Sequence, residues 1–159
     1  MSRTILIPTD LTVGSLNTLK LSLTDSGPER VGVVLMHARL LGSSITDLLF
    51  HDPARELQAH IRPEFGDALA ILRNRFEDRL TRLDLALFHG RTTSAFVQFA
   101  KAKKVDEVHV PHGYDLRLHG QAIDPIPLIR RSGLPVVEVG WAPNPAAMGI
   151  NELQMLFAS

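Results

Sequence analysis

The chain has 159 residues and no cysteine, and its 17 Lys and Arg residues balance 17 Asp and Glu residues. The lack of cysteine excludes disulfides, a thiolate nucleophile and a cysteine metal site, and it suits a reducing cytoplasm. A net charge of zero argues against nucleic-acid binding, and no uncharged apolar run approaches the roughly 18 residues of a membrane helix. We therefore expect a soluble, cytoplasmic protein.

The first half of the chain predicts two buried strands with a helix between them. Residues 4–9 and 31–38 are short apolar runs without alternation, typical of strands that are covered on both faces. Between them, leucines recur at helical spacing from Leu16 until stop signals at residues 25–28. In the looser pattern that follows, we expect a short helix at residues 45–50 and a break at Asp52 and Pro53.

The second half continues the alternation of helices and strands. Pro63 suits a first helical turn, and apolar residues then recur every three or four positions as far as Leu83. Thr92 and Thr93 offer hydroxyl caps for a further helix. The predicted helices of this half span residues 63–83, 92–100 and 124–131. The predicted strands span residues 83–88, 106–111 and 135–139.

Five strands alternating with four helical segments predict a three-layer α/β sandwich with a parallel, Rossmann-like sheet. This domain spans residues 1–140. The tail at residues 141–159 is apolar, and Pro143 and Pro145 separate it from the last strand. We expect the tail to pack on its own domain or on a second subunit.

Ligands of open parallel sheets bind beyond the carboxyl ends of the strands. We therefore expect residues 106–139 to line the cleft, together with the ends of the other strands. The candidate ligand-binding residues are Asp10, His37, His89, Pro111, His112, Gly113, Arg117 and His119. No helical histidine pair and no Gly-x-Ser-x-Gly turn occurs, so we assign no metal ligand and no catalytic residue.

The loop from Gly113 to Asp124 leads into a helix, but it is a poor phosphate site. Pro125 and Pro127 each lack an N–H group, and Asp124 adds negative charge at the helix start. A phosphate chain should be repelled there. Residues 90–94 also lead into a helix, with one arginine and three hydroxyl groups, but an ordinary capped helix is the simpler interpretation.

The pattern up to Val139 resembles the universal stress protein family. The residues that carry the resemblance are ILIPTD at 5–10, VVLMHA at 33–38, His89 with Gly90, DEVHVPHG at 106–113 and SGLPVVEV at 132–139. The resemblance implies a five-stranded parallel sheet in the order 3-2-1-4-5, the adenine nucleotide alpha hydrolase-like arrangement. That order places Asp10 opposite residues 111–113.

Family members that bind ATP carry Gly-x-x-Gly, nine residues, and then Gly followed by Ser or Thr. Here the ungapped alignment puts Pro111 and Tyr114 on the two loop glycines, and Asp124 and Pro125 on the last pair. A start at Gly113 does not restore the motif. The chain is thus similar to a divergent member that lacks the intact ATP motif and retains only the aspartate after the first strand.

The resemblance implies a homodimeric, non-catalytic regulatory or binding module of the stress response, without a cofactor and with a protein partner not identified by the sequence. Family members commonly dimerise through strand five, which here would place Val136, Val137 and Val139 in the interface. One alternative is an adenine-nucleotide-binding protein with a remodelled cleft. Another is a metal or hydrolytic site built on His37, His89, His112 and His119.

Overall fold

A computed structural model of the chain describes residues 3–25, 27–40, 49 and 52–141. The strands are β1 Arg3–Pro8, β2 Val31–Ala38, β3 Leu80–Phe88, β4 Glu107–His112 and β5 Val136–Gly140. The helices are α1 Leu16–Asp25, α3 Pro53–His60, α4 Pro63–Arg75, α5 Thr93–Ala102 and α6 Ile126–Arg131. All strand pairs are parallel and the order is β3-β2-β1-β4-β5. The predicted sheet and its order are confirmed.

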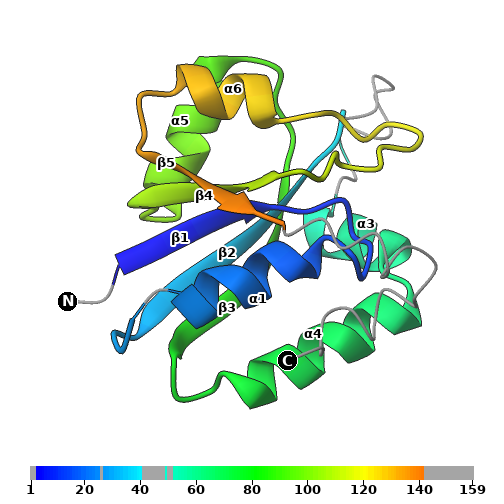
Figure 1. The fold of residues 1–159 in the computed structure, drawn as a ribbon. Helices are drawn as coiled ribbons and strands as arrows, with labels where there is room; N and C mark the ends of the chain where they lie inside the picture. The colour runs from blue at the N-terminus through cyan, green and yellow to red at the C-terminus, as the bar shows by residue number, and fades with distance from the viewer. Residues whose placement is uncertain (1–2, 26, 41–48, 50–51, 142–159) are drawn as a thin grey trace.

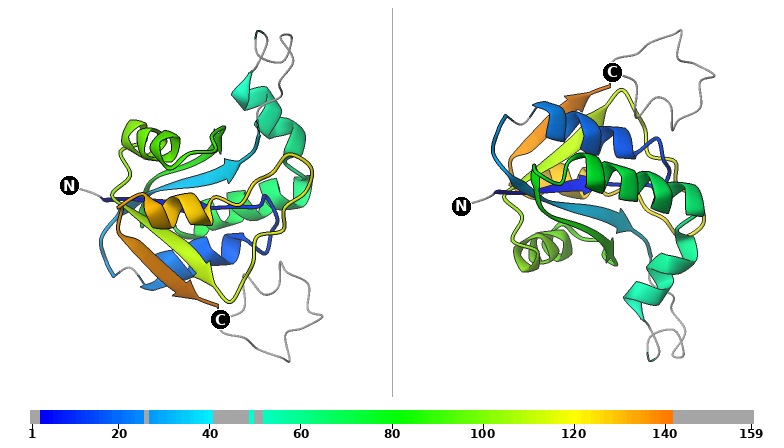
Figure 2. Two further views of the ribbon diagram at one scale, coloured as in Figure 1. Left: turned by 90° about the horizontal axis from the view of Figure 1, so that it is seen from above. Right: turned by 90° about the horizontal axis from the view of Figure 1, so that it is seen from below.

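Helices cover both faces of the sheet, which gives the three predicted layers (Figures 1 and 2). Because successive strand residues point to opposite faces, Ile5 and Ile7 enter the core beneath α1 and α4. Leu6 enters the second core, with α5 and α6. β2 is buried along its whole length, as its unbroken apolar run predicts.

The helix that begins at Pro63 is shorter than predicted. α4 ends at Arg75, and β3 already begins at Leu80, so the predicted continuation of the helix to Leu83 is wrong. The cause is an irregularity in β3, where the register with β2 skips Thr81. Such a bulge lets Leu80 and Leu83, three residues apart, both face the core, and this spacing imitates a helix.

One helix was not predicted at all. Asp52, where the sequence predicts a break, is the N-cap of α3, and its Oδ1 accepts the backbone N–H groups of Ala54 at 3.1 Å and Arg55 at 3.3 Å. Among the described side chains of α3, Leu57 alone is buried and joins the core, so the repeated apolar positions of an amphipathic helix are missing there. Among the described residues, α3 is thus a fifth helix beside the four helical segments of the predicted sandwich.

The other predicted boundaries agree to within a residue or two, apart from the start of β3. The short helix predicted at residues 45–50 lies, except for residue 49, outside the described residues. The tail lies outside them as well, apart from Trp141. None of the helices in the described ranges combines the length and the apolar character that crossing a membrane requires.

Candidate ligand-binding site

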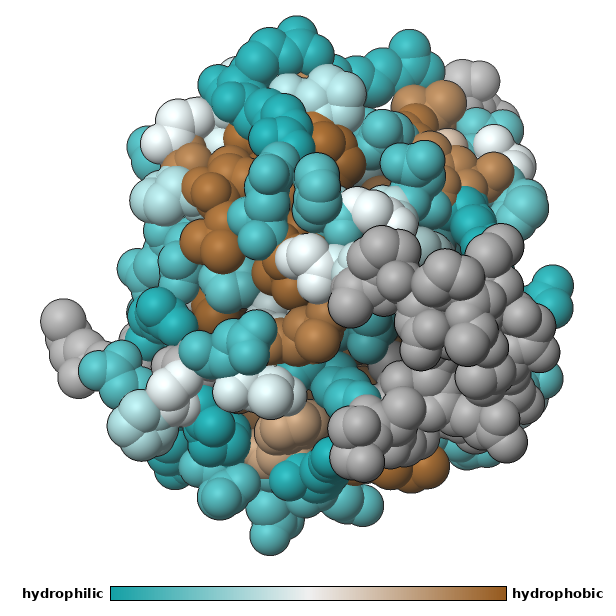
Figure 3. Space-filling model, viewed as in Figure 1, coloured by the Kyte–Doolittle hydropathy of each residue, from teal (hydrophilic) through white to brown (hydrophobic). Residues whose placement is uncertain are grey.

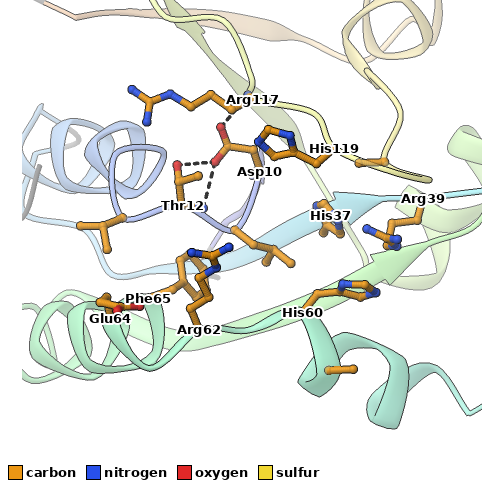
Figure 4. A pocket seen from close by; sticks show the side chains of 14 residues that line it. Asp10, Thr12, His37, Arg39, His60, Arg62, Glu64, Phe65, Arg117 and His119 are labelled. Atoms are coloured by element: carbon orange, nitrogen blue, oxygen red, sulfur yellow. Dashed lines mark hydrogen bonds between the residues drawn. The ribbon is translucent and has the colours of Figure 1, made fainter.

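A pocket of about 700 Å³ opens at the carboxyl ends of β1 and β2 (Figure 4). It lies beside the point where the strand order reverses, between β1 and β4. Its walls come from the turn after β1, the end of β2, the segment from α3 to α4, and the loop between β4 and α6. Its ionisable side chains are Asp10, Glu64, Arg39, Arg62, Arg117, His37, His60 and His119.

Asp10 is 8% exposed and accepts four hydrogen bonds. Oδ1 accepts the backbone N–H of Thr12 at 3.0 Å and its hydroxyl at 2.5 Å. Oδ2 accepts the hydroxyl of Tyr114 and, at 2.8 Å, the backbone N–H of Arg117. Burial alone would raise the pKa of Asp10, but these donors outweigh it and lower the pKa below its usual value. The carboxylate is therefore ionised and has its acceptor positions filled.

The turn after β1 holds this carboxylate in place. Leu11 adopts a left-handed conformation with φ 63°, which is costly for a leucine. Its N–H is bonded to Oγ1 of Thr9 at 3.1 Å, and that oxygen also lies 2.7 Å from Oγ of Ser15. The short polar side chains of this turn thus stabilise a conformation that directs Asp10 toward the β4–α6 loop.

The start of the β4–α6 loop is packed by aromatic side chains. The ring of Tyr114 stacks on Trp141, with centroids 4.1 Å apart and an interplanar angle of 19°. Trp141 donates from Nε1 to Oγ1 of Thr18 at 3.1 Å. Gly113, with φ 91°, takes a backbone conformation that side-chain-bearing residues rarely adopt. Burial, followed by the bond to Asp10, raises the pKa of Tyr114, so its hydroxyl stays a donor.

His37 is 3% exposed and lines the pocket. Its Nδ1 lies 3.0 Å from the carbonyl oxygen of Thr9, which can only accept, so Nδ1 carries a hydrogen. Burial is the main cause that lowers the pKa of His37, and the positive charges of Arg39 and His60 lower it further. The ring is thus neutral near pH 7, and Nε2 is a hydrogen-bond acceptor. This nitrogen is buried and has no partner among the described residues.

The wall around His37 is rich in basic side chains. Arg39 follows β2, His60 ends α3 and Arg62 precedes α4 (Figure 4). Nε of Arg39 is buried and, within the described ranges, has no hydrogen-bond partner. The close-up places Glu64 beside Phe65, apart from His37, Arg39 and His60. The sequence analysis did not identify these three basic residues. Arg39 directly follows a predicted strand, so the rule that ligands bind at the strand ends could have found it.

Four of the eight predicted site residues line the pocket, namely Asp10, His37, Arg117 and His119. The other four do not, namely His89, Pro111, His112 and Gly113. Of residues 106–139, which we expected to line the cleft, only Arg117, His119 and Ala122 do so. The reason is that the loop turns back to Asp10, so its later residues and not its first ones face the pocket.

His89 and His112 lie elsewhere. Nδ1 of His89 is 2.8 Å from the carbonyl oxygen of Arg39, and Nε2 is 2.6 Å from Oε2 of Glu56, so the ring ties α3 to the sheet. The side chain of His112 is 72% exposed, with Nδ1 3.9 Å from Oε2 of Glu138. In the part of the chain that the structure describes, no three His, Asp or Glu residues converge as metal ligands would.

The sequence matches no protein-family model and no curated protein. Among solved structures, the chain is similar to the hypothetical protein MJ0577, at 19% identity and a TM-score of 0.54, over 91% of this chain and 99% of that one. It is also similar to a universal stress protein family protein from Arabidopsis thaliana with AMP bound, at 12% identity and a TM-score of 0.50, over 94% and 98% of the chains. The chain has the universal stress protein fold. The hypothetical protein PH0823, at 19% identity and a TM-score of 0.51 over 91% and 99%, is another similar structure.

In the universal stress protein fold of this chain, the ATP motif would run from the end of β4 into α6. Asp124 accepts the N–H of Ile126 at 3.0 Å through Oδ1, and Pro125 and Pro127 have none to offer. The start of α6 therefore differs from a phosphate-binding helix start, in which free N–H groups face the anion.

Proposed function

We propose that the protein is a member of the universal stress protein family that acts as a non-catalytic regulatory module of the stress response in the cytoplasm. Its ligand is small and binds in the pocket at the ends of β1 and β2. ATP is not held through the β4–α6 loop. The observation that carries this proposal is the start of α6, where the N–H of Ile126 is bonded to Asp124 and two prolines replace donors.

Asp10 supports the same conclusion. Its two oxygens bind Thr12, Tyr114 and Arg117, so the residue acts as an anchor for the loop and has no acceptor position left for a ligand. A hydrolytic role would need a free base near a bound substrate, and this carboxylate is committed to the protein itself.

Calorimetric titration of the full chain with Mg²⁺–ATP tests the proposal. We expect no micromolar binding that depends on the β4–α6 loop, and no ATP hydrolysis. Asp124→Ala is a suitable loop variant, because it removes the acceptor of the N–H of Ile126. Asp106→Ala is the matched control: it also removes an exposed carboxylate, but just before the start of β4, away from this loop. Tight ATP binding that changes with Asp124→Ala but not with Asp106→Ala would contradict the proposal.

The proposed assembly is a homodimer through β5. This strand pairs only with β4 among the described residues, which leaves one edge of its backbone open. Val137 is 40% exposed, and Figure 3 shows apolar side chains gathered over the region of α5, α6 and β5. Val136 is half-buried, whereas Val139 is buried within the chain, so Val137 is the best candidate for a contact.

A second candidate function is binding of an adenine mononucleotide in the same pocket. The similar Arabidopsis protein was solved with AMP bound, and a volume of about 700 Å³ falls within the range of ordinary ligand pockets. Titration with AMP and adenosine separates this function from the first, because adenosine binding would require recognition of the base.

A further inference from the structure

We infer that the end of the pocket formed by His37, Arg39 and His60 binds the phosphate group of a small phosphate monoester, which shares one proton with Nε2 of His37. The inference rests on the proposed function only in placing the ligand in this pocket. It adds a ligand class and a binding position on the β2–α3 side of the pocket, away from the start of α6.

The first observation is the unpartnered acceptor. His37 is 3% exposed, its Nδ1–H is used by the carbonyl of Thr9, and its buried Nε2 has no partner within the described ranges. A buried acceptor without a donor is unfavourable, so a ligand that offers an O–H or N–H group is favoured here. His37 lines the pocket, so a group bound there lies beside its ring and can meet this acceptor.

The second observation is the positive charge beside that acceptor. Arg39 and His60 are close enough to His37 for their charges to act on its ring. Arg62, Arg117 and His119 add further basic groups to the same pocket. Asp10, the carboxylate whose charge acts on His37, has its oxygens engaged by four donors and offers these basic groups no direct hydrogen bond. An anionic group therefore fits this end of the pocket.

A phosphate monoester satisfies both observations together. Carboxylates and sulfate are fully ionised at neutral pH, so they offer Nε2 no hydrogen, whereas a phosphate monoester has a second pKa of about 6 and readily keeps one. Its P–O–H donates to Nε2 while its other oxygens accept from the guanidinium of Arg39, a planar donor suited to phosphate. The complex holds one proton whether that proton resides on the phosphate or on His37.

This arrangement makes the affinity depend on pH. Above pH 7 the free monoester is a dianion, and binding must take one proton from solvent. The affinity should then fall about tenfold for each pH unit, as for any one-proton linkage. The charged and titratable groups that border His37 or its pocket, and whose charges bear on this dependence, are Asp10, Arg39, His60, Arg62, Glu64, Arg117 and His119.

Calorimetric titration of the full chain tests the inference, with inorganic phosphate, AMP, adenosine and sulfate as the probes. Between pH 7 and 8.5, in two buffers of different ionisation enthalpy, we expect AMP to bind with uptake of one proton. Inorganic phosphate keeps its second proton to a higher pH than a monoester does, so its proton uptake should approach one only toward pH 8.5. Adenosine and sulfate should bind at least about tenfold more weakly.

Three variants locate the site. His37→Asn keeps a side-chain N–H toward the carbonyl of Thr9 and removes Nε2, and Arg39→Gln removes the charge. Each should weaken phosphate and AMP binding about tenfold or more, and His37→Asn should also abolish proton uptake. Arg55→Gln is the matched control, because Arg55 lies on α3 with His60, is exposed and does not line the pocket. Melting curves of each variant establish that it is folded.

Several results would overturn the inference. They are a failure of phosphate and AMP to bind, sulfate binding as tight as phosphate at pH 8, or unchanged binding by a folded His37→Asn variant. Adenosine binding as tight as AMP would replace phosphate recognition by base recognition. A failure of the proposed function gives a different result. ATP would then bind with an affinity that changes in the Asp124→Ala variant, whereas the His37→Asn variant would bind ATP as tightly as the wild type does.

Discussion

The backbone N–H of Arg117 donates a hydrogen bond of 2.8 Å to the carboxylate of Asp10, which lies 107 residues earlier in the chain. The bond joins the turn after β1 to the loop after β4, at the point where the strand order reverses. Tyr114, which stands three residues earlier in that loop, donates to the same oxygen. Asp10 is thus the residue that closes the β4–α6 loop over this edge of the sheet.

Replacing Asp10 with Asn should destabilise the protein. Whichever way the amide of the variant turns, its N–H₂ faces a backbone N–H, either that of Thr12 or that of Arg117. One of these donors therefore loses its acceptor, which costs about 1–3 kcal/mol. Urea unfolding followed by the fluorescence of Trp141, the single tryptophan of the chain, measures this cost. Exposed Asp115 on the same loop gives the control Asp115→Asn, which should leave the midpoint unchanged. An Asp10→Asn variant as stable as the wild type would disprove the anchoring role.

Asp10 should also stabilise the fold less in acid. Burial raises the pKa of Asp10, but the hydrogen bonds from Thr12, Tyr114 and Arg117 together lower it by more than burial raises it. The folded pKa therefore lies below the unfolded value of about 3.9. Its contribution is therefore complete above about pH 4 and is lost as the pH falls through the folded pKa. The difference in unfolding free energy between wild type and Asp10→Asn should shrink from pH 6 to pH 3. A constant difference would contradict this assignment.

Tyr114→Phe tests the contribution of the Tyr114 hydroxyl independently of that of the ring. The variant keeps the stack on Trp141 but removes one of the four donors to Asp10, and a hydrogen bond to a charged group contributes about 1.5–3 kcal/mol. We expect a stability loss of that order and a raised pKa of Asp10, which carboxyl NMR titration can measure. An unchanged pKa would show that the hydroxyl is not a donor to this carboxylate.

Two buried histidines should make the fold less stable at mildly acidic pH. Burial is the main cause that lowers the pKa of both His37 and His109, while the unfolded chain titrates near pH 6.5. His109 lies 2.8 Å from Oγ of Ser22 through Nδ1, beside Glu107 and Arg3. Below about pH 6.5 the unfolded chain binds more protons than the folded chain, so stability falls until the pH passes the folded pKa values.

Chemical unfolding between pH 8 and pH 5 measures this dependence. His109→Asn keeps a polar group toward Ser22 and removes the titrating ring, so its stability should vary less with pH than that of the wild type. His112→Asn is the control, because His112 is exposed. Equal pH slopes for wild type and His109→Asn would show that His109 is not neutral in the folded chain.

Val137→Lys tests the proposed homodimer. A lysine at this exposed position on the open edge of β5 should oppose strand pairing between copies. Light scattering should give twice the chain mass for the wild type and a shift toward monomer for the variant. Ile71→Lys, on α4 and 47% exposed, is a matched control that should leave the mass unchanged. A monomeric wild type at high micromolar concentration would rule out this assembly.

Much of the sheet could be predicted from local pattern, because a strand that is covered on both faces must be apolar throughout. The run at residues 31–38 is such a strand, and its predicted bounds are those of β2. β3 was predicted too short because its bulge at Thr81 gives a strand helical spacing. α3 escaped prediction because a helix with so little buried surface carries little periodic signal.

The candidate site was predictable only where a residue follows a strand directly. Asp10 and His37 were found in this way, since the carboxyl ends of parallel strands meet at one edge of the sheet. His60 and Arg62 were not, because their place in the pocket depends on how α3 and α4 pack beside β2. No local signal in the sequence carries that information.

The sequence by itself determined the alternation of strands and helices and the missing donors at the start of α6, because apolar periodicity and the absent N–H of proline are properties of the chain alone. Only the tertiary structure decided that Asp10 binds the protein's own loop and that His37 keeps a buried acceptor without a partner among the described residues. Hydrogen bonds and burial depend on distances between residues remote in the chain, and these distances exist only once the sheet and its helices have packed.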